Sequence, residues 1–253
     1  MEKKRKVIKL GGKSIATPAL LEQAKKFVLR EYSAGYEISV VISAIGDFTN
    51  QTTSIIKAFG RPSEEWDYIL SMGERAAAPI FSLILKNAGA RSRFYDPLLP
   101  GWFVVTDEKP GDAKPILQEC ERLAKKSLVP YLKTGIPVVP GYIGMSKAGK
   151  IRVMGRNSSD LTAVLVAKCI GAVEVIKVTD VPYLHNPSTK EPIKKSTPAE
   201  IMELFGKRYE GYDKPNYPIF PQALELINGM TLKIGTYESL RDNTATVING
   251  GEK

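Results

Sequence analysis

Three short segments gather glycine, small polar and charged residues, and each directly follows an apolar run. The first is the segment Lys9–Ser14, with sequence KLGGKS. Paired glycines let backbone N–H groups approach an anion closely, and an adjacent lysine supplies a positive charge. The Gly-x4-Gly-Lys-Ser/Thr spacing of a Walker loop is absent. The segment is therefore a candidate phosphate cradle, although Gly-Gly after a strand is more often only a turn.

The second and third segments each open a predicted helix. In Ser43–Asn50 (SAIGDFTN), the simplest interpretation is a capping turn made by Asp47 or Thr49. The third, Gly155–Thr162 (GRNSSDLT), is more unusual, because a plain cap needs only its serine or aspartate. Its arginine, Arg156, fits two-pronged recognition of a carboxylate or a phosphate.

Composition limits the class of protein. The 253 residues are 43% hydrophobic and 25% charged, which predicts a globular chain with a sizeable core. No run approaches 18 consecutive apolar residues, so we expect no membrane span. The basic N-terminus has no apolar h-region after it, so we expect the protein to stay in the cytoplasm. Cys120 and Cys169 make neither a disulfide framework nor a metal set.

The charge balance and the histidine content exclude further mechanisms. With 36 basic and 27 acidic residues, the net charge is +9. The Lys and Arg residues are mostly scattered, which favours a basic solvated surface and makes nucleic acid the weakest partner hypothesis. His185 is the single histidine. A multi-histidine metal site therefore lacks its ligands, and a Ser-His-Asp or Cys-His arrangement would have to use this one residue.

The elements that position these segments alternate between apolar runs and amphipathic stretches. Strands are predicted at about 6–10, 38–42, 93–95, 103–106, 136–142, 151–154, 173–178, 230–234 and 246–248. Helices are predicted at about 18–31, 50–59, 64–85 with Ser63 as N-cap, 115–126, 160–170, 198–205 and 221–228. A hairpin turn at Lys147–Lys150 is expected to join strands 136–142 and 151–154. Such alternation predicts one continuous α/β domain over residues 1–253, with a parallel sheet covered on both faces and ligands at its carboxyl edge.

Five motifs, in order, resemble those of the aspartokinases of the amino-acid kinase superfamily: KLGGKS, VISAIGDFTN, SMGE, GRNSSDLTA and VTDV. They extend from Lys9 to Val181, and a looser resemblance continues to Asn249. The resemblance implies a three-layer α/β/α sandwich with a mainly parallel central sheet. It also implies an amino-acid-binding lobe at about 1–150, a nucleotide-binding lobe at about 151–253, and in-line transfer of the γ-phosphoryl group of ATP.

The resemblance assigns roles to individual residues. Lys9 and Asp160 are the catalytic pair, and Lys9 stabilises the transferring phosphate. The phosphate-binding residues are Gly11, Gly12, Lys13, Ala44 and Gly46. The substrate-binding residues are Ser43, Thr49, Glu74 for the ammonium group, Arg156 for the α-carboxylate, and Ser159. The nucleotide-binding residues are Thr179, Asp180 and Lys214. ATP and Mg²⁺ are the implied cofactors, and no residue is assigned as a metal ligand.

The chain also departs from the family pattern. Lys13 stands where the family has threonine, and GRGGSD has become GRNSSD, so that two glycines have gained side chains. The segment after Asp180 is about two residues shorter. Near the end, Tyr217 falls on a family lysine position, which makes Lys214 the candidate substitute. The sequence ends where regulatory ACT domains would begin, so we expect no feedback inhibition through them.

Together these features predict an ATP-dependent amino-acid kinase that phosphorylates the β-carboxylate of L-aspartate. An ionised carboxylate acceptor needs no general base, so the shortage of histidine is no obstacle. One alternative is homoserine or another small amino acid, phosphorylated on a hydroxyl with Asp160 or Asp47 as base. Another is a non-catalytic protein that binds a nucleotide or anion on this scaffold. We expect a homodimer formed through the kinase domain itself, with no membrane partner.

Overall fold

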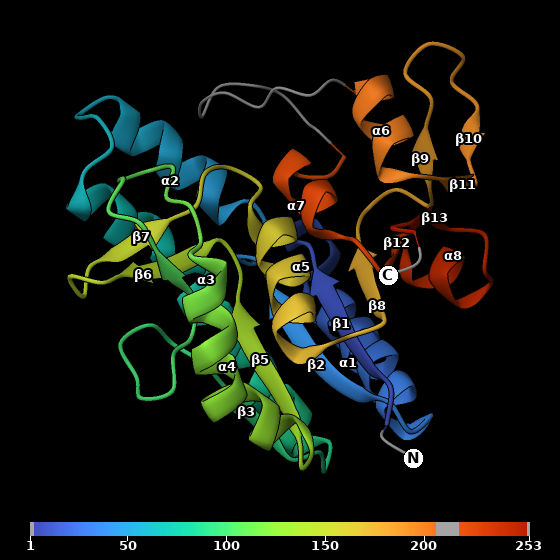
Figure 1. The fold of residues 1–253 in the computed structure, drawn as a ribbon, viewed down its shortest axis with the longest axis horizontal. Helices are drawn as coiled ribbons and strands as arrows, with labels where there is room; N and C mark the ends of the chain where they lie inside the picture. Colours follow the sequence, from blue (N-terminus) through green and yellow to red (C-terminus); the bar gives the residue numbers. More distant parts are fainter. Residues whose placement is uncertain (1–2, 206–217, 252–253) are drawn as a thin grey trace.

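The computed structural model describes residues 3–205 and 218–251. A sheet of eight strands forms the centre, in the order β11-β13-β12-β8-β1-β2-β5-β3 (Figure 1). Their bounds are β1 (Arg5–Leu10), β2 (Glu37–Ile42), β3 (Ser92–Phe94), β5 (Ile136–Pro140), β8 (Glu174–Val178), β11 (Lys195–Ser196), β12 (Thr231–Gly235) and β13 (Thr246–Asn249). All neighbouring pairs are parallel except β12 and β13.

Helices cover both faces of this sheet. Their bounds are η1 (Gly12–Ile15, a 3-10 turn), α1 (Pro18–Ser33), α2 (Phe48–Lys57), α3 (Glu64–Asn87), α4 (Leu117–Leu132), α5 (Ser159–Ile170), α6 (Pro198–Phe205), α7 (Pro221–Leu226) and α8 (Tyr237–Arg241). The side chains of α4, α5 and α7 pack on one face, and those of α1, α3 and α8 pack on the other. The predicted three-layer α/β/α sandwich with a mainly parallel sheet is confirmed.

Side-chain alternation along the central strands separates the two cores. On β1, Val7 lies in the core under α5, whereas Ile8 lies in the core on the opposite face. On β8, Val175 and Ile176 divide in the same way. Because successive side chains of a strand point to opposite faces, Lys9 and Lys177 belong to the α5 face. Two lysines are therefore directed under the helix that carries Asp160.

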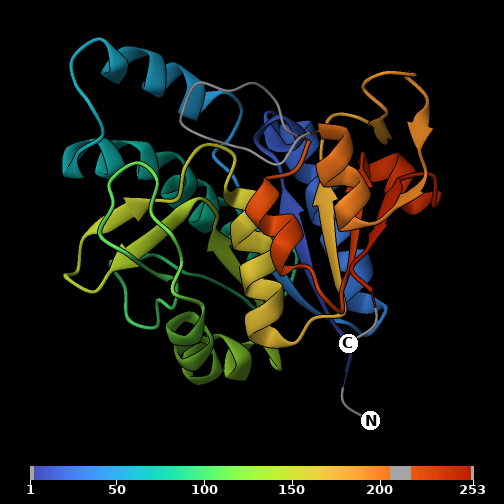
Figure 2. The ribbon, with the colours of Figure 1, turned by 45° about the horizontal axis from the view of Figure 1, so that its top comes forward.

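Two smaller sheets lie apart from the central one. One contains β4 (Val105–Thr106), β6 (Ile143–Ser146) and β7 (Ile151–Val153), and the other pairs β9 (Leu184–His185) with β10 (Pro192–Ile193). Figures 1 and 2 show the β6–β7 hairpin beside α3, on the opposite side of the molecule from β9 and β10. The carboxyl edge of the central sheet lies between them.

The predicted hairpin needs a correction. The turn at Lys147–Lys150 is present, but it joins β6 to β7 rather than continuing from the strand that begins at Ile136. The chain leaves the central sheet after Pro140, where Tyr142 takes a positive φ of 70° that a regular strand does not allow. The prediction treated one apolar run as one strand, and the bend at Tyr142 divides it.

Helix α3 combines great length with an apolar composition. Among the described helices it alone is long and apolar enough, by those two criteria, to cross a membrane. Half of its most apolar window is buried inside the structure, as in a core helix. Ser63 caps it as predicted, since the Ser63 hydroxyl accepts a hydrogen bond from the N–H of Trp66. The buried face of α3 also carries Glu74 towards the carboxyl edge of the sheet.

Candidate active site

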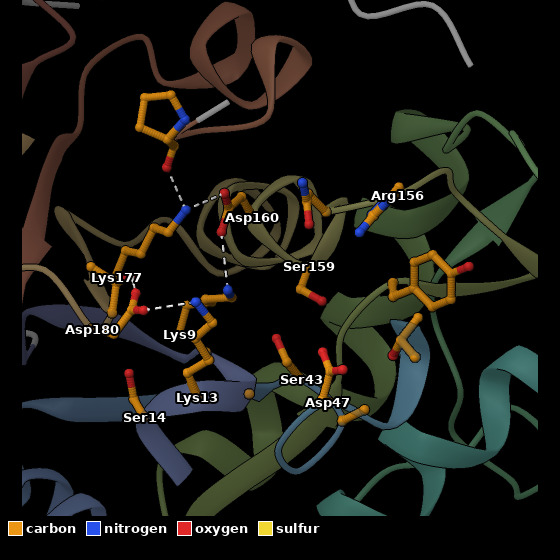
Figure 3. A pocket seen from close by; sticks show the side chains of 18 of the residues that line it. Lys9, Lys13, Ser14, Ser43, Asp47, Arg156, Ser159, Asp160, Lys177 and Asp180 are labelled. Atoms are coloured by element: carbon orange, nitrogen blue, oxygen red, sulfur yellow. Dashed lines mark hydrogen bonds and ion pairs between the residues drawn. The ribbon is translucent and has the colours of Figure 1, made fainter. Parts of the chain in front are cut away.

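A cavity of about 490 Å³ opens at the carboxyl ends of the central strands. Its lining contains every candidate site residue that the sequence predicted within the described chain, namely Lys9, Gly11, Gly12, Lys13, Ser43, Ala44, Gly46, Thr49, Glu74, Arg156, Ser159, Asp160, Thr179 and Asp180. Lys214, the remaining candidate, lies outside the described residues. Figure 3 shows the lining from close by. The structure thus places these residues together, while their individual roles stay predictions.

A backbone hydrogen bond joins the loop of Lys9–Ser14 to the loop of Ser43–Asn50. The N–H of Gly46 donates to the carbonyl oxygen of Gly12 at 3.0 Å. A Cβ atom at Gly12 would lie 2.6 Å from the carbonyl oxygen of Ala44, closer than real Cβ contacts allow. Glycine at position 12 is therefore required by the approach of the two backbones, which leaves a narrow, backbone-lined wall on this side of the cavity.

The floor of the cavity holds a cluster of two lysines and one aspartate. The parallel register of β1 and β8 places Lys9 directly beside Lys177. Asp160, in the first turn of α5, lies 3.2 Å from the Lys9 Nζ and 2.5 Å from the Lys177 Nζ (Figure 3). Burial opposes ionisation of this carboxyl, but Lys177 and Lys9 hold its pKa below the usual value. Asp160 is therefore a carboxylate that organises two cations.

Sequence reasoning missed Lys177. Its run Val173–Val178 (VEVIKV) predicts only an apolar strand. The available signal was the two-residue period, which puts Lys177 on the same face as the buried Val175. A lysine on a buried face of a central strand needs a partner, and that requirement could have drawn attention to it.

Glu74 presents a buried carboxyl group to the cavity from the middle of α3. Only 3% of the residue is exposed. Its Oε2 atom has no hydrogen-bond partner among the described residues. Burial raises the pKa of Glu74 to about 8, despite the N–H of Ala44 and the charge of Lys9. Unpaired buried carboxylate oxygens are costly, so this arrangement favours a cationic ligand such as an ammonium group.

Arg156 is presented by the third loop. Gly155 and Asn157 on either side of it both have positive φ, 85° and 66°. Asparagine tolerates this left-handed region better than most residues, so the loss of a family glycine at 157 leaves the turn intact. An Nη atom of Arg156 donates to the Oδ1 of Asn50 at 2.7 Å, which ties the loop to α2. The guanidinium group is thereby held at the cavity wall on the side of the second loop.

Lys13 and Asp180 close one side of the cavity mouth. Their side chains form an ion pair of 3.0 Å and are 77% and 47% exposed. Burial raises the pKa of the Asp180 carboxyl, but the hydrogen bond and charge of Lys13, together with hydrogen bonds from its own backbone and from Thr179, bring the pKa below its ordinary value. The hydroxyl of Thr179 donates to the same carboxylate at 3.1 Å. Lys13, where the family has threonine, thus links the loops after β1 and β8.

Comparison with known proteins assigns the chain to a family. The profile of the amino acid kinase family matches residues 4–234. The chain belongs to the amino acid kinase family. Among curated proteins, it is 26% identical to the aspartokinase of Geobacillus stearothermophilus over 248 residues, covering 96% of this chain and 58% of that protein. It is 31% identical to aspartokinase 2 of Bacillus subtilis over 179 residues, covering 70% of this chain and 42% of that protein.

Solved structures share the fold of this amino acid kinase family member. Escherichia coli aspartokinase III in complex with aspartate and ADP superposes with a TM-score of 0.81 at 22% identity, covering 98% of this chain and 65% of that chain. Giardia lamblia carbamate kinase bound to AMP-PNP gives a TM-score of 0.64 at 15% identity, covering 98% and 99%. The chain spans less than 60% of the length of the two curated aspartokinases. The predicted resemblance to aspartokinases is confirmed.

Proposed function

We propose that this amino acid kinase uses ATP to phosphorylate the β-carboxylate of L-aspartate, forming 4-phospho-L-aspartate and ADP. The observation that carries the proposal is the unpaired carboxylate oxygen of Glu74, which lines the same cavity as Arg156 and the Lys9–Asp160–Lys177 cluster. One cavity thus offers an anion for an ammonium group, an arginine for a carboxylate and lysines for phosphate. The similarity to curated aspartokinases supports the same acceptor.

The acceptor is held by groups of opposite charge. The Glu74 carboxylate binds its α-ammonium group, and the Arg156 guanidinium binds its α-carboxylate through two parallel N–H donors. Ser43, Thr49 and Ser159 line the same cavity and supply hydroxyl groups around the acceptor. Recognition at both α-substituents fixes the amino acid as a rigid body, so its side chain is directed to one place. An oriented acceptor lowers the barrier mainly by positioning.

The transfer step needs positioning and charge neutralisation. A β-carboxylate oxygen of aspartate forms a bond to the γ-phosphorus, and the bond from that phosphorus to the β–γ bridging oxygen breaks. The electron pair of the broken bond goes to ADP, and the γ-phosphoryl group becomes part of the acyl phosphate. Charge on the phosphoryl oxygens is met by the Lys9 ammonium, which Asp160 holds in place at 3.2 Å. The backbone at Gly11, Gly12 and Gly46 forms the wall beside it.

Magnesium fits the chemistry of this cavity. The described residues contain no group of three or more His, Cys, Asp or Glu side chains that could hold a metal ion. Mg²⁺ needs no such cage, because it usually keeps several waters and binds one or two carboxylates together with substrate phosphates. Asp180, a half-exposed carboxylate at the cavity mouth, is the residue suited to hold Mg²⁺ carried by ATP. When bound, the ion supplies further neutralisation of phosphate charge.

The low pKa of Asp160 favours a carboxylate acceptor over a hydroxyl acceptor. Phosphorylation of homoserine needs a base near the hydroxyl. Asp160 is a poor base here, because Lys177 and Lys9 keep its pKa low. Asp47, the other candidate base, is exposed and accepts a hydrogen bond from the Asn50 amide. An aspartate side chain is already ionised at neutral pH and needs no base.

An acceptor screen tests the proposal. The purified protein is incubated with Mg²⁺-ATP and either L-aspartate, L-homoserine, L-glutamate, L-serine or no amino acid, and ADP release is measured. We expect release above background with L-aspartate and little with the others. Release with homoserine in preference to aspartate would support the hydroxyl acceptor instead. Nucleotide binding without release for any amino acid would support a non-catalytic binding protein.

A further inference from the structure

Lys177 stands out among the buried charges because of its surroundings. It lies on the central strand β8, and its side chain is 12% exposed. The Lys177 Nζ donates to the Asp160 carboxylate and to the carbonyl oxygen of Pro218, each at 2.5 Å (Figure 3). An ammonium group has three N–H donors, and these two contacts use two of them. The side chain also lines the main cavity, so its third donor can serve a bound ligand.

The charges around Lys177 do not balance within the described structure. Asp160 is shared by two lysines, since Lys9 contacts its other oxygen at 3.2 Å. The first carboxylate after the end of β8, Asp180, forms its ion pair with Lys13 at the cavity mouth. Within this contact cluster two lysines share one carboxylate, which is an excess of one basic group in a largely buried place. Uncompensated buried charge is costly, so such a cluster favours an anionic ligand.

We propose that Lys177 is a second phosphate-binding lysine, which works beside Lys9 on the phosphate chain of the nucleotide while Asp160 positions both ammonium groups. The inference deepens the proposed kinase function and rests on it. In this proposal Lys177 on β8, rather than Lys214, takes the place of the family lysine that is missing at Tyr217. Because Lys9 and Lys177 are neighbours in the β1–β8 register, one phosphoryl group can meet both at the edge where the strands end.

The contact with Pro218 adds a link to the chain before α7. Pro218 precedes Phe220, whose N–H donates to the same Asp160 carboxylate at 3.4 Å. Lys177 and Asp160 together hold this segment against α5. A purely structural role would consist of these contacts alone. The structural role and the phosphate-binding role require different properties of the side chain. A side-chain amide can supply the hydrogen bonds of the structural role, whereas phosphate binding needs the positive charge.

Two substitutions of Lys177 and one control separate these roles. Lys177→Gln keeps N–H donors for Asp160 and Pro218 and removes the charge, and Lys177→Met removes both. Lys233→Met is the matched control. Lys233 lies beside Ile176 of β8, on the neighbouring strand β12, and pairs with Glu174 at 2.7 Å, away from the cavity. For each variant, the thermal midpoint, kcat, both KM values and the Kd of AMP-PNP by calorimetry are measured.

We expect Lys177→Gln to keep a thermal midpoint near that of the unmodified protein and to lose about 10²-fold in kcat, as when one preorganised charge contact is removed. The Kd of AMP-PNP should rise about tenfold in Lys177→Gln and Lys177→Met, with the amino-acid KM changed less than about threefold. Lys233→Met should match the unmodified protein in all kinetic values. The tenfold loss of nucleotide affinity corresponds to about 1.4 kcal/mol.

Two results would contradict phosphate binding by Lys177 or the kinase function on which it rests. If Lys177→Gln keeps kcat and AMP-PNP affinity within about threefold of the unmodified protein, Lys177 has a structural role only and the inference is wrong. If Lys177→Met does not fold, the decision rests on Lys177→Gln. If the unmodified protein phosphorylates no amino acid, the proposed function fails, and the AMP-PNP measurement still decides whether Lys177 binds phosphate.

Discussion

Lys13 and Asp180 form a 3.0 Å ion pair that joins the loops after two adjacent parallel strands, β1 and β8, at the mouth of the cavity. Both side chains are well exposed, at 77% and 47%. Exposed pairs stabilise a fold by about 0–1 kcal/mol. The pair therefore has little value for stability, and from its position at the cavity mouth we expect it to act in ligand binding.

We expect Lys13→Thr, which restores the family residue, to leave the free energy of unfolding within about 1 kcal/mol of its original value. The KM for ATP should rise about three- to tenfold, because one cation near the phosphates is lost. Steady-state kinetics at low and moderate salt measure the KM for ATP, and urea unfolding measures the free energy of unfolding. An unchanged KM for ATP at low salt would show that Lys13 does not contact the nucleotide.

Lys9→Ala is expected to remove most of the turnover and keep the fold. In the proposed mechanism the Lys9 ammonium meets charge on the transferring phosphoryl group, and losing such a contact costs about 10²–10³ in kcat. Asp160 keeps Lys177 as a partner at 2.5 Å in this variant, so its charge stays paired. The measurement is kcat together with the circular dichroism spectrum. Turnover at the original rate would refute the assigned role of Lys9.

The acceptor side is tested by Arg156→Lys, which keeps the charge. A lysine cannot reproduce the planar two-pronged donor of arginine, nor its 2.7 Å hydrogen bond to Asn50 in the same geometry. The loss should be about 2–5 kcal/mol in kcat/KM for the amino acid, by analogy with buried charge pairs. The KM for ATP should change little. An unchanged kcat/KM for an amino acid that is turned over would contradict the assigned site.

Glu74 makes acceptor binding depend on pH. Burial raises its pKa to about 8 in the ligand-free protein, so near pH 7 most of the carboxyl is protonated. An ammonium group binds the carboxylate form, so binding must release that proton. We expect kcat/KM for the amino acid to rise about tenfold per pH unit below 8 and to level off above it.

The control for this pH dependence is Glu74→Gln. That variant should have a much lower kcat/KM for the amino acid and no rise of kcat/KM between pH 6.5 and 8.5. The KM for ATP should show no matching dependence in either protein. A flat kcat/KM profile in the unmodified protein would show that Glu74 does not bind the ammonium group.

The homodimer stays a prediction, and α3 offers the surface for it. Its outer face exposes Met72, Ile80 and Leu83 at 43%, 41% and 57%. Acidic residues lie at its first turn and Lys86 at its last, so two copies packed antiparallel would place opposite charges together. Light scattering at micromolar concentration should show a dimer, and Leu83→Glu should shift it to monomer. Ile55→Glu, on the exposed face of α2, serves as the control. A monomeric unmodified protein would contradict this prediction.

The sequence allowed the fold and most of the cavity to be predicted for physical reasons. Alternating strands and helices required a parallel sheet, and parallel strands bring their carboxyl ends together, so Lys9, Ala44 and Asp180 had to meet at one edge. The bend at Tyr142 was missed, because an apolar run does not reveal a positive φ. Lys177 was missed because its importance comes from the β1–β8 register, which places it beside Lys9. The burial that shifts the pKa of Glu74 is also a property of packing rather than of its motif.

The nature of the product tests the proposed aspartate kinase activity most directly. Acyl phosphates react with hydroxylamine to give hydroxamates, whereas phosphate esters of hydroxyl acceptors do not. The purified protein is supplied with Mg²⁺-ATP, L-aspartate and hydroxylamine, and aspartyl hydroxamate and ADP are quantified together. We predict equal amounts of hydroxamate and ADP, and neither product above background when L-aspartate is omitted. ADP release without hydroxamate, or no ADP release with L-aspartate, would contradict phosphorylation of the β-carboxylate.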